Sequence, residues 1–222
     1  MSRPRILDLF CCSGGAGVGY ARAGFDVVGV DIQPRPRYPL PFVQADALDV
    51  LRDVDYLRQF HAVHTSPPCQ AKCSLTKGTN AAMAERYVDL YPIVAPLLYA
   101  AGVPGVIENP AARADVVLCG EMFGLGVLRH RRFELANWVT SKPKHVKHRG
   151  RVRGWRHGQY HDGPYIAAYG KGGGKGSASE IQEAMGITWT DVHEELTEAI
   201  PPAYTEWIGG RLMKHLTAAE TG

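Results

Sequence analysis

The chain has 222 residues, of which 45% are hydrophobic and 21% charged, and its formal net charge is +3. This composition is ordinary for a water-soluble globular protein, and the most apolar stretch, residues 91–107, contains three prolines, so no membrane-spanning helix is predicted. Five cysteines without a disulfide spacing, and a start without a signal-peptide pattern, predict a cytoplasmic protein, which we expect to be monomeric.

Strands and helices alternate over the first 70 residues in the order typical of a parallel α/β sheet, and further strands and a helix follow up to residue 137. Apolar strands are predicted at residues 5–10, 26–32, 42–48, 62–68, 103–110 and 131–137. Helices are predicted at residues 19–25 and, despite two internal prolines, at residues 84–102. A sheet of this kind binds its ligands at the carboxyl ends of its strands.

The turn after the first strand has the composition of a ligand cradle. Gly14, Gly15 and Gly17 lack the Cβ atoms that would keep a ligand away from the backbone. Their spacing differs from the G-x-G-x-x-G of dinucleotide-binding turns, which disfavours a dehydrogenase. Asp31, at the end of the second strand, can accept hydrogen bonds from ribose hydroxyls, and Asp46 can accept one from an adenine amino group. The alternative for either acid is a helix cap or a solvated strand end.

Cys69 directly follows Pro67 and Pro68 at the end of the fourth strand. The two prolines restrict the backbone and present the next side chain at the edge of the sheet where ligands bind. A thiolate in that place can act as a nucleophile. The alternatives are a buried core thiol and a metal ligand paired with Cys73. Because no second ligand pair of the zinc type is visible, we expect no metal.

Glu108 ends another apolar strand, in the sequence VIENP. Burial of a carboxyl group raises its pKa, so Glu108 can be a proton donor near neutral pH. Arg129 and Arg131 come just before the last strand of the series and can clamp a base oxygen or a phosphate. The alternative for the arginines is a basic run on the surface.

A basic segment follows. Residues 129–175 contain 12 Lys and Arg against two acids, whereas the rest of the chain has a net charge of −7. Such a block is typical of phosphate-backbone binding, although a solvated positive face has the same composition. A short helix is then predicted near residues 181–187, and a final amphipathic helix from Pro201 or Pro202. We expect a catalytic domain at 1–135, a basic insertion at 136–189 and a C-terminal segment at 190–222 that returns to the catalytic domain.

Taken together, these motifs resemble the DNA cytosine-C5 methyltransferase family. The first motif of that family is similar to DLFCCSGG, its nucleophile motif to PPCQ, its glutamate motif to IEN, its paired-arginine motif to RHR and its final, cofactor-closing motif to AIPPAYTEWIG. The order also agrees, and the resemblance covers nearly the whole chain outside residues 136–189. It implies the Rossmann-like α/β fold of S-adenosylmethionine-dependent methyltransferases, with a small inserted recognition region.

The resemblance also implies the chemistry, which is methyl transfer from S-adenosylmethionine to C5 of a cytosine flipped out of double-stranded DNA. Cys69 would add to C6 of the base, Glu108 would contact N3 and the exocyclic amine, and Arg129 and Arg131 would hold the base oxygen. Residues 70–85 would close behind the flipped base. The implied cofactor-binding residues are Asp8, Phe10, Gly14, Gly15, Asp31, Ile32, Asp46, Ala47 and Pro67.

Several positions depart from the family pattern. Cys12 stands in place of a glycine, Pro110 in place of a valine, Val127 in place of a glutamine and Glu198 in place of an asparagine. A register of the arginine pair that uses Arg132 is also open. Two alternative functions share most of the motifs: the same chemistry on RNA, and a DNA-binding relative that does not methylate. An amino-methyltransferase is disfavoured, because those enzymes resemble D/N-P-P-Y/F where this chain has a cysteine.

Overall fold

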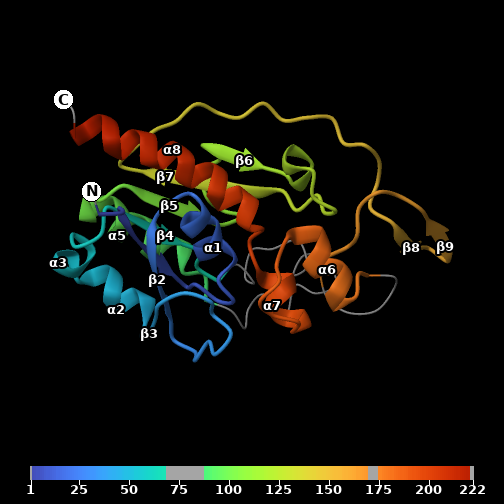
Figure 1. Ribbon diagram of the computed structural model, residues 1–222, viewed down its shortest axis with the longest axis horizontal. Coiled ribbons are helices and arrows are strands. Elements are labelled where there is room, and N and C mark those ends of the chain that lie inside the picture. The colour runs from blue at the N-terminus through green and yellow to red at the C-terminus, as the bar shows by residue number, and fades with distance from the viewer. Residues whose placement is uncertain (1, 69–87, 170–174, 221–222) are drawn as a thin grey trace.

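In the computed structural model, a seven-stranded sheet lies between two layers of helices (Figure 1). The structure describes residues 2–68, 88–169 and 175–220. The strands of the sheet are β1 (Arg5–Leu9), β2 (Asp26–Asp31), β3 (Phe42–Gln44), β4 (Ala62–Thr65), β5 (Gly105–Glu108), β6 (Val116–Leu118) and β7 (Arg131–Ala136). The helices are α1 (Gly15–Arg22), α2 (Ala47–Arg52), α3 (Val54–Leu57), α5 (Tyr91–Ala101), the 3-10 helix η3 (Gly120–Phe123), α6 (Ala178–Met185), α7 (His193–Glu198) and α8 (Pro202–Glu220).

The strand order is β3-β2-β1-β4-β5-β7-β6. The strands from β3 to β5 are parallel, as predicted, but β7 is antiparallel to both β5 and β6. The parallel arrangement predicted from the first 70 residues is confirmed for β1 to β4, whereas the direction of β7 had not been predicted. The connection from β6 to β7 contains only η3, so the chain re-enters the sheet in the opposite direction rather than through a helical crossover.

Each face of the sheet carries its own hydrophobic core, because successive side chains of a strand point to opposite faces. Ile6 packs on one side with Tyr20 of α1 and Tyr204 of α8. Its neighbour Leu7 packs on the other side, where α2, α3 and α5 contribute residues such as Leu98. In the part of the chain that the structure describes, no helix is both long enough and apolar enough to cross a membrane.

Helix α8 begins at Pro202, as predicted, and lies directly against α1 (Figure 1). The two helices meet at Gly19, where a Cβ atom would lie 2.0 Å from Oγ1 of Thr205 and 2.2 Å from the carbonyl oxygen of Pro202. The Thr205 hydroxyl donates to the carbonyl oxygen of Ala16, 2.8 Å away. Only glycine permits this approach, so the end of the chain is fixed beside the turn that precedes α1.

The predicted insertion contains a hairpin and contributes to a small third core, neither of which was predicted. Strands β8 (Gly154–Arg156) and β9 (Gln159–His161) pair antiparallel and project from one end of the molecule (Figure 1). The third core consists of Val127, Ala168, Ile181, Ala184, Met185, Ile187, Leu196 and Ala199. Its residues come from all three of the predicted divisions of the chain, so the boundaries at 135 and 189 stay a prediction.

Candidate functional site

The turn between β1 and α1 has a strained backbone. Phe10, Cys12 and Gly14 all adopt positive φ angles, of 57°, 47° and 87°. This conformation is natural for glycine but costs other residues about 1–3 kcal/mol each, and residues held in it cluster at ligand sites. The strain therefore supports the prediction that this turn holds a ligand.

Residues 189–200 cover this turn from the C-terminal side. The indole N–H of Trp189 donates to the carbonyl oxygen of Ser13 (2.6 Å), and the Ser13 hydroxyl donates to the carbonyl oxygen of Glu195 (3.1 Å). A Cβ atom on Gly15 would lie 2.2 Å from the carbonyl oxygen of Ile200. The first and last motifs of the sequence thus meet in space, as the resemblance predicts for a cofactor-closing motif.

Two of the departures from the family pattern lie in contact with each other. The Cys12 thiol donates to Oε2 of Glu198 across 3.6 Å. Burial raises the pKa of Cys12 to about 12, so the thiol stays protonated and keeps this donor. The cysteine and the glutamate that replace the usual glycine and asparagine therefore form one local adaptation of the turn and its cover.

Asp8, on β1, is completely buried beneath the turn. Its Oδ2 accepts a hydrogen bond from the Tyr38 hydroxyl at 3.3 Å, whereas its Oδ1 has no hydrogen-bond partner among the described residues. Burial raises the pKa of Asp8 to about 7, although the bonds from Tyr38 and from the backbone of Gly17 oppose this shift. Tyr38 was not predicted as a site residue, because its local sequence gives no sign of a contact with Asp8, 30 residues away.

Asp31 ends β2, as predicted, and holds the turn in place. Its Oδ2 accepts the backbone N–H of Cys12 (3.0 Å), its Oδ1 accepts that of Gln33 (2.9 Å), and Arg35 forms an ion pair with it at 3.1 Å. A ribose bound to Asp31 would share the carboxylate with Arg35. Ile32, the next residue, is 59% exposed, which leaves an apolar side chain open beside the carboxylate.

Asp46 caps helix α2, because its Oδ1 accepts the backbone N–H of Leu48 at 2.8 Å. This is the structural alternative that the sequence left open for it. Ala47, the first residue of α2, is buried. Contacts of Asp46 and Ala47 with adenine stay a prediction.

Glu108 ends β5 and is 7% exposed. Its Oε1 lies 3.4 Å from Nε of Arg131, at the start of the antiparallel neighbour β7. Burial raises the pKa of Glu108, and the positive charges of Arg131 and Arg129 partly offset the rise. Among the described residues, Glu134 on β7 is also a buried glutamate. It accepts hydrogen bonds from Tyr91, Tyr99 and the backbone of Arg113, so its carboxylate is used within the protein fold.

Asn109 connects the end of β5 to the end of β4. Its amide nitrogen donates to the carbonyl oxygen of Pro67 at 3.3 Å, while its Oδ1 accepts the N–H of Ala111 at 2.9 Å. Pro67, and with it the start of the PPCQ motif, is therefore held beside Glu108. Cys69 and residues 70–85 lie outside the described residues, so the position of the nucleophile stays a prediction.

Arg129 and Arg131 have different surroundings. Arg131 faces Glu108, whereas the Arg129 guanidinium donates to three backbone carbonyls, those of Ala168 (2.6 Å), Thr197 and Ala199 (both 2.9 Å). Arg129 thus joins the insertion to the C-terminal segment, and its contact with a base oxygen stays a prediction. Arg132, the alternative partner, is exposed and reaches the carbonyl oxygen of Pro110 at 3.4 Å.

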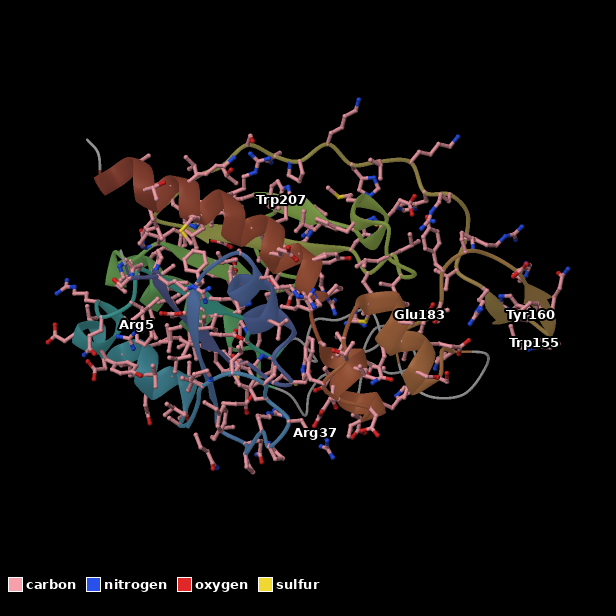
Figure 2. All side chains as sticks on the ribbon, viewed as in Figure 1. Arg5, Arg37, Trp155, Tyr160, Glu183 and Trp207 are labelled. Carbon is pink, nitrogen blue, oxygen red and sulfur yellow. The ribbon has the colours of Figure 1, made fainter. Side chains whose placement is uncertain are left out.

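The tip of the β8–β9 hairpin exposes two aromatic rings. Trp155 is 59% and Tyr160 48% exposed, and their rings meet edge to face at 5.7 Å (Figure 2). Arg151, beside the hairpin, is also exposed and contacts His161. Cations beside open aromatic rings form a surface on which nucleic-acid bases can stack.

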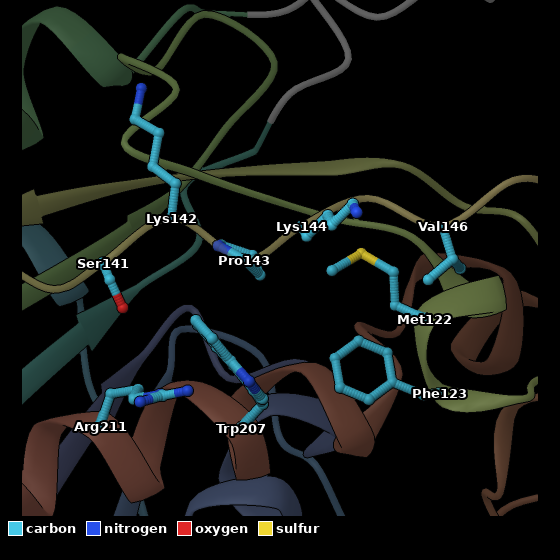
Figure 3. A pocket seen from close by; sticks show the side chains of 9 residues that line it. All are labelled: Met122, Phe123, Ser141, Lys142, Pro143, Lys144, Val146, Trp207 and Arg211. Carbon is cyan, nitrogen blue, oxygen red and sulfur yellow. The ribbon is translucent and has the colours of Figure 1, made fainter.

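A separate cavity of about 380 Å³ lies between α8, η3 and the chain that leads out of β7 (Figure 3). Trp207, Phe123 and Met122 gather on one side of it, and Lys142 and Lys144 come from the other. None of its lining residues is a predicted site residue, so this cavity belongs to a different part of the molecule.

Comparisons with known proteins agree with the geometry at the level of the fold. No family model matches the chain, and no curated protein matches its sequence. Solved structures do match it, among them two that align over nearly its full length. The Dnmt2 methyltransferase of S. pombe is 14% identical, with a TM-score of 0.60, and the methyltransferase EhMeth of Entamoeba histolytica is 12% identical, with a TM-score of 0.57. Both alignments cover 97% of this chain and 99% of the other. The predicted methyltransferase fold is thereby confirmed.

Proposed function

We propose that the protein is a DNA cytosine-C5 methyltransferase that uses S-adenosylmethionine. The observation that supports this most strongly is the placement of a buried carboxyl group, Glu108, beside Arg131 and, through Asn109, beside the carbonyl of Pro67. Cys69 comes two residues after Pro67 in the sequence. A general acid and a thiol nucleophile at one strand edge are what attack on a cytosine ring requires.

The roles of these side chains follow from the chemistry of the base. C5 of cytosine is a poor nucleophile until a thiolate adds to C6, which places negative charge on the ring. A protonated Glu108 would donate to N3 and neutralise that charge, and its buried position keeps the proton at higher pH than an exposed glutamate would. Arg131 would orient the carboxyl group. C5 would then take the methyl group from the sulfonium of the cofactor, which would leave as a neutral thioether. Loss of the C5 proton, return of the N3 proton to Glu108 and elimination of the Cys69 thiolate would release 5-methylcytosine.

The turn between β1 and α1 has features that fit S-adenosylmethionine, which would supply the methyl group. Asp8 has a buried oxygen without a hydrogen-bond partner among the described residues, and Ile32 is an open apolar surface next to Asp31. The space beside Gly15 is filled by the backbone of Ile200, so this glycine serves the packing of the segment that covers the turn. The residues that would hold the cofactor are those of the sequence prediction: Asp8, Phe10, Gly14, Gly15, Asp31, Ile32, Asp46, Ala47 and Pro67. Asp31 would do so only by sharing its carboxylate with Arg35.

DNA is proposed as the substrate on the basis of the basic insertion and its hairpin. Trp155 and Tyr160 are open for stacking, and the segment before them carries many cations. Part of the formal charge is neutralised, since Arg149 pairs with Glu121 and Arg153 with Glu180. Lys144 and Lys147 are exposed and could contact phosphates without specifying a sequence.

The test is methyl transfer from tritium-labelled S-adenosylmethionine to three polymers of mixed sequence: duplex DNA, single-stranded RNA and structured RNA. The proposal predicts label in duplex DNA and 5-methylcytosine in its nuclease digest. Label only in RNA would keep the chemistry and overturn the DNA substrate. Label on adenine, or on the exocyclic nitrogen of cytosine, would overturn the chemistry itself.

A further inference from the structure

Four side chains with metal-binding atoms converge at the edge of the sheet. None of them is a predicted catalytic or cofactor-binding residue, although His130 lies between Arg129 and Arg131 in the sequence. Cys119 directly follows β6, and His130 directly precedes β7. The other two, His145 and His148, lie in the stretch between β7 and β8. The Sγ atom and one nitrogen of each imidazole all lie within 4.8 Å of one another.

The closest of these contacts have the separations of ligands on one zinc ion. Sγ of Cys119 lies 3.5 Å from Nε2 of His148, and Nε2 of His130 lies 3.1 Å from Nε2 of His145. With Zn–S of about 2.3 Å and Zn–N of about 2.0–2.1 Å, a tetrahedral ion sets S···N at about 3.6 Å and N···N at about 3.4 Å. Both contacts agree with this within a few tenths of an ångström. The widest separation in the cluster is at most 4.8 Å, so side-chain shifts of little more than an ångström would bring all four atoms onto one ion.

The chemistry of the set selects the ion. A thiolate and three imidazoles are ligands for zinc and unsuitable for magnesium or calcium, which take oxygen donors. Four protein ligands also complete a tetrahedral shell and leave no position for a substrate. We therefore propose that Cys119, His130, His145 and His148 bind one structural Zn²⁺ ion.

The ion would fix the basic stretch that leads to the hairpin. Residues 139–150 have no helix or strand of their own and run along the outside of the sheet, toward β8 and β9 (Figure 1). On the far side of His148, the Tyr165 hydroxyl accepts the N–H of Arg149 (2.9 Å) and donates to Glu121 (2.5 Å). With zinc bound, this stretch would be tied to both β6 and β7, and the direction of the exposed hairpin would be set.

This inference departs from the sequence prediction that no metal is bound. That prediction considered Cys69 and Cys73, which are close in sequence. The ligands proposed here have a short spacing only at His145 and His148, and Cys119 and His130 reach them through the fold. The zinc site does not depend on the proposed reaction, because its ligands include none of the catalytic or cofactor residues.

The test is the metal content of the full-length chain, purified without a polyhistidine tag from zinc-supplemented medium and dialysed without chelator. Plasma mass spectrometry should find about one zinc per chain. Cys119→Ser and the double variant His145→Asn/His148→Asn should each lower the zinc content at least tenfold. His157→Asn is the matched control, because it removes an exposed histidine of the same insertion and leaves the cluster intact.

A spectrum separates binding at this cluster from binding elsewhere. Cobalt added to the zinc-free chain should give the thiolate charge-transfer band and the intense visible bands of a tetrahedral site, and Cys119→Ser should abolish the charge-transfer band. If Cys119→Ser misfolds, the double variant keeps the test valid, because His145 is exposed and His148 is only partly buried. Circular dichroism is the check on folding. Wild-type chain with less than a tenth of a zinc ion, or full zinc retention in the folded double variant, would overturn the inference.

Discussion

The Nε atom of Arg131 lies 3.4 Å from Oε1 of Glu108, across the antiparallel pair of β7 and β5. The pairing depends on a feature of the sheet that was not predicted, the reversed direction of β7. Because β7 runs toward the opposite edge, its first residues lie beside the last residue of β5. An arginine that precedes one strand in the sequence is thereby brought to the carboxyl end of another.

Replacing Glu108 with glutamine should remove the proton donor and keep the shape of the side chain. We expect kcat for methyl transfer to fall about 10²–10⁴-fold, the usual contribution of a general acid, with DNA affinity changed only a few-fold. Burial raises the pKa of Glu108, so wild-type activity should fall on the alkaline side as this proton is lost. The residual activity of Glu108→Gln should lack that limb. A variant with near-normal kcat would assign Glu108 a structural role.

The pH dependence of stability should report on Asp8. Its pKa is raised from 3.8 to about 7 by burial, so its contribution to stability is complete below pH 4 and is lost as the pH rises to 7. Asp8→Asn cannot ionise, so its free energy of unfolding should rise relative to that of the wild type as the pH increases over that range, by up to about 4 kcal/mol. Urea unfolding of the cofactor-free protein at pH 4.5 and pH 8 measures the difference. Asp26→Asn, at an exposed position, controls for the loss of a carboxylate, and an equal pH response of both variants would contradict the prediction.

Two glycines in helices form a matched pair for the packing of α1 on α8. Gly19→Ala should lower the free energy of unfolding by about 1–3 kcal/mol, because the new methyl group would meet Thr205 and the backbone of Pro202. Gly210→Ala should raise it by about 0.5–1 kcal/mol, since its Cβ would meet nothing within 4 Å in the described structure and alanine favours a helix. Equal effects in chemical denaturation would rule out the close approach of the two helices at Gly19.

The contacts of Arg129 predict that lysine cannot replace it. A lysine has no planar fork of donors and cannot reach the carbonyls of Ala168, Thr197 and Ala199 together. Arg129→Lys should therefore cost about 1–3 kcal/mol of stability and weaken S-adenosylmethionine binding, because residues 197–199 help to cover the cofactor turn. Arg132→Lys, at an exposed position, should change stability by less than about 0.5 kcal/mol. Calorimetry measures the stability of both variants, and ligand titration measures their affinity for S-adenosylmethionine. If Arg132 were the structural member of the pair, Arg132→Lys would show the larger losses.

Much of the site could be predicted because its parts lie at the ends of strands. Apolar runs in the sequence indicated the strands β1, β2, β4 and β5. In a parallel sheet, the residues that follow such strands all lie at one edge. Asp31 and Glu108 were placed in this way, and the structure confirms both positions. The glycine turn was also predictable, since Gly14 needs a backbone conformation that other residues adopt only under strain.

The rest depends on contacts between distant segments, which local patterns do not encode. Tyr38 reaches Asp8 from a loop without periodicity, and Arg129 is held by carbonyls 39 to 70 residues away. Strand β6 has three residues, too few to show an alternation of apolar and polar positions. The ligand cluster around Cys119 was missed for the same reason, because its residues come together only when β6 and β7 pair.

Trapping of a covalent adduct tests the central claim most directly, because the claim is that Cys69 attacks C6 of cytosine. The protein should be incubated with S-adenosylmethionine and duplex DNA in which 5-fluorocytosine replaces cytosine, then denatured and resolved by electrophoresis. Fluorine at C5 cannot leave as a proton does, so the thioether to C6 should persist. We predict a denaturation-resistant protein–DNA band for the wild type and none for Cys69→Ser. Absence of the band in the wild type, or its persistence in Cys69→Ser, would contradict the account.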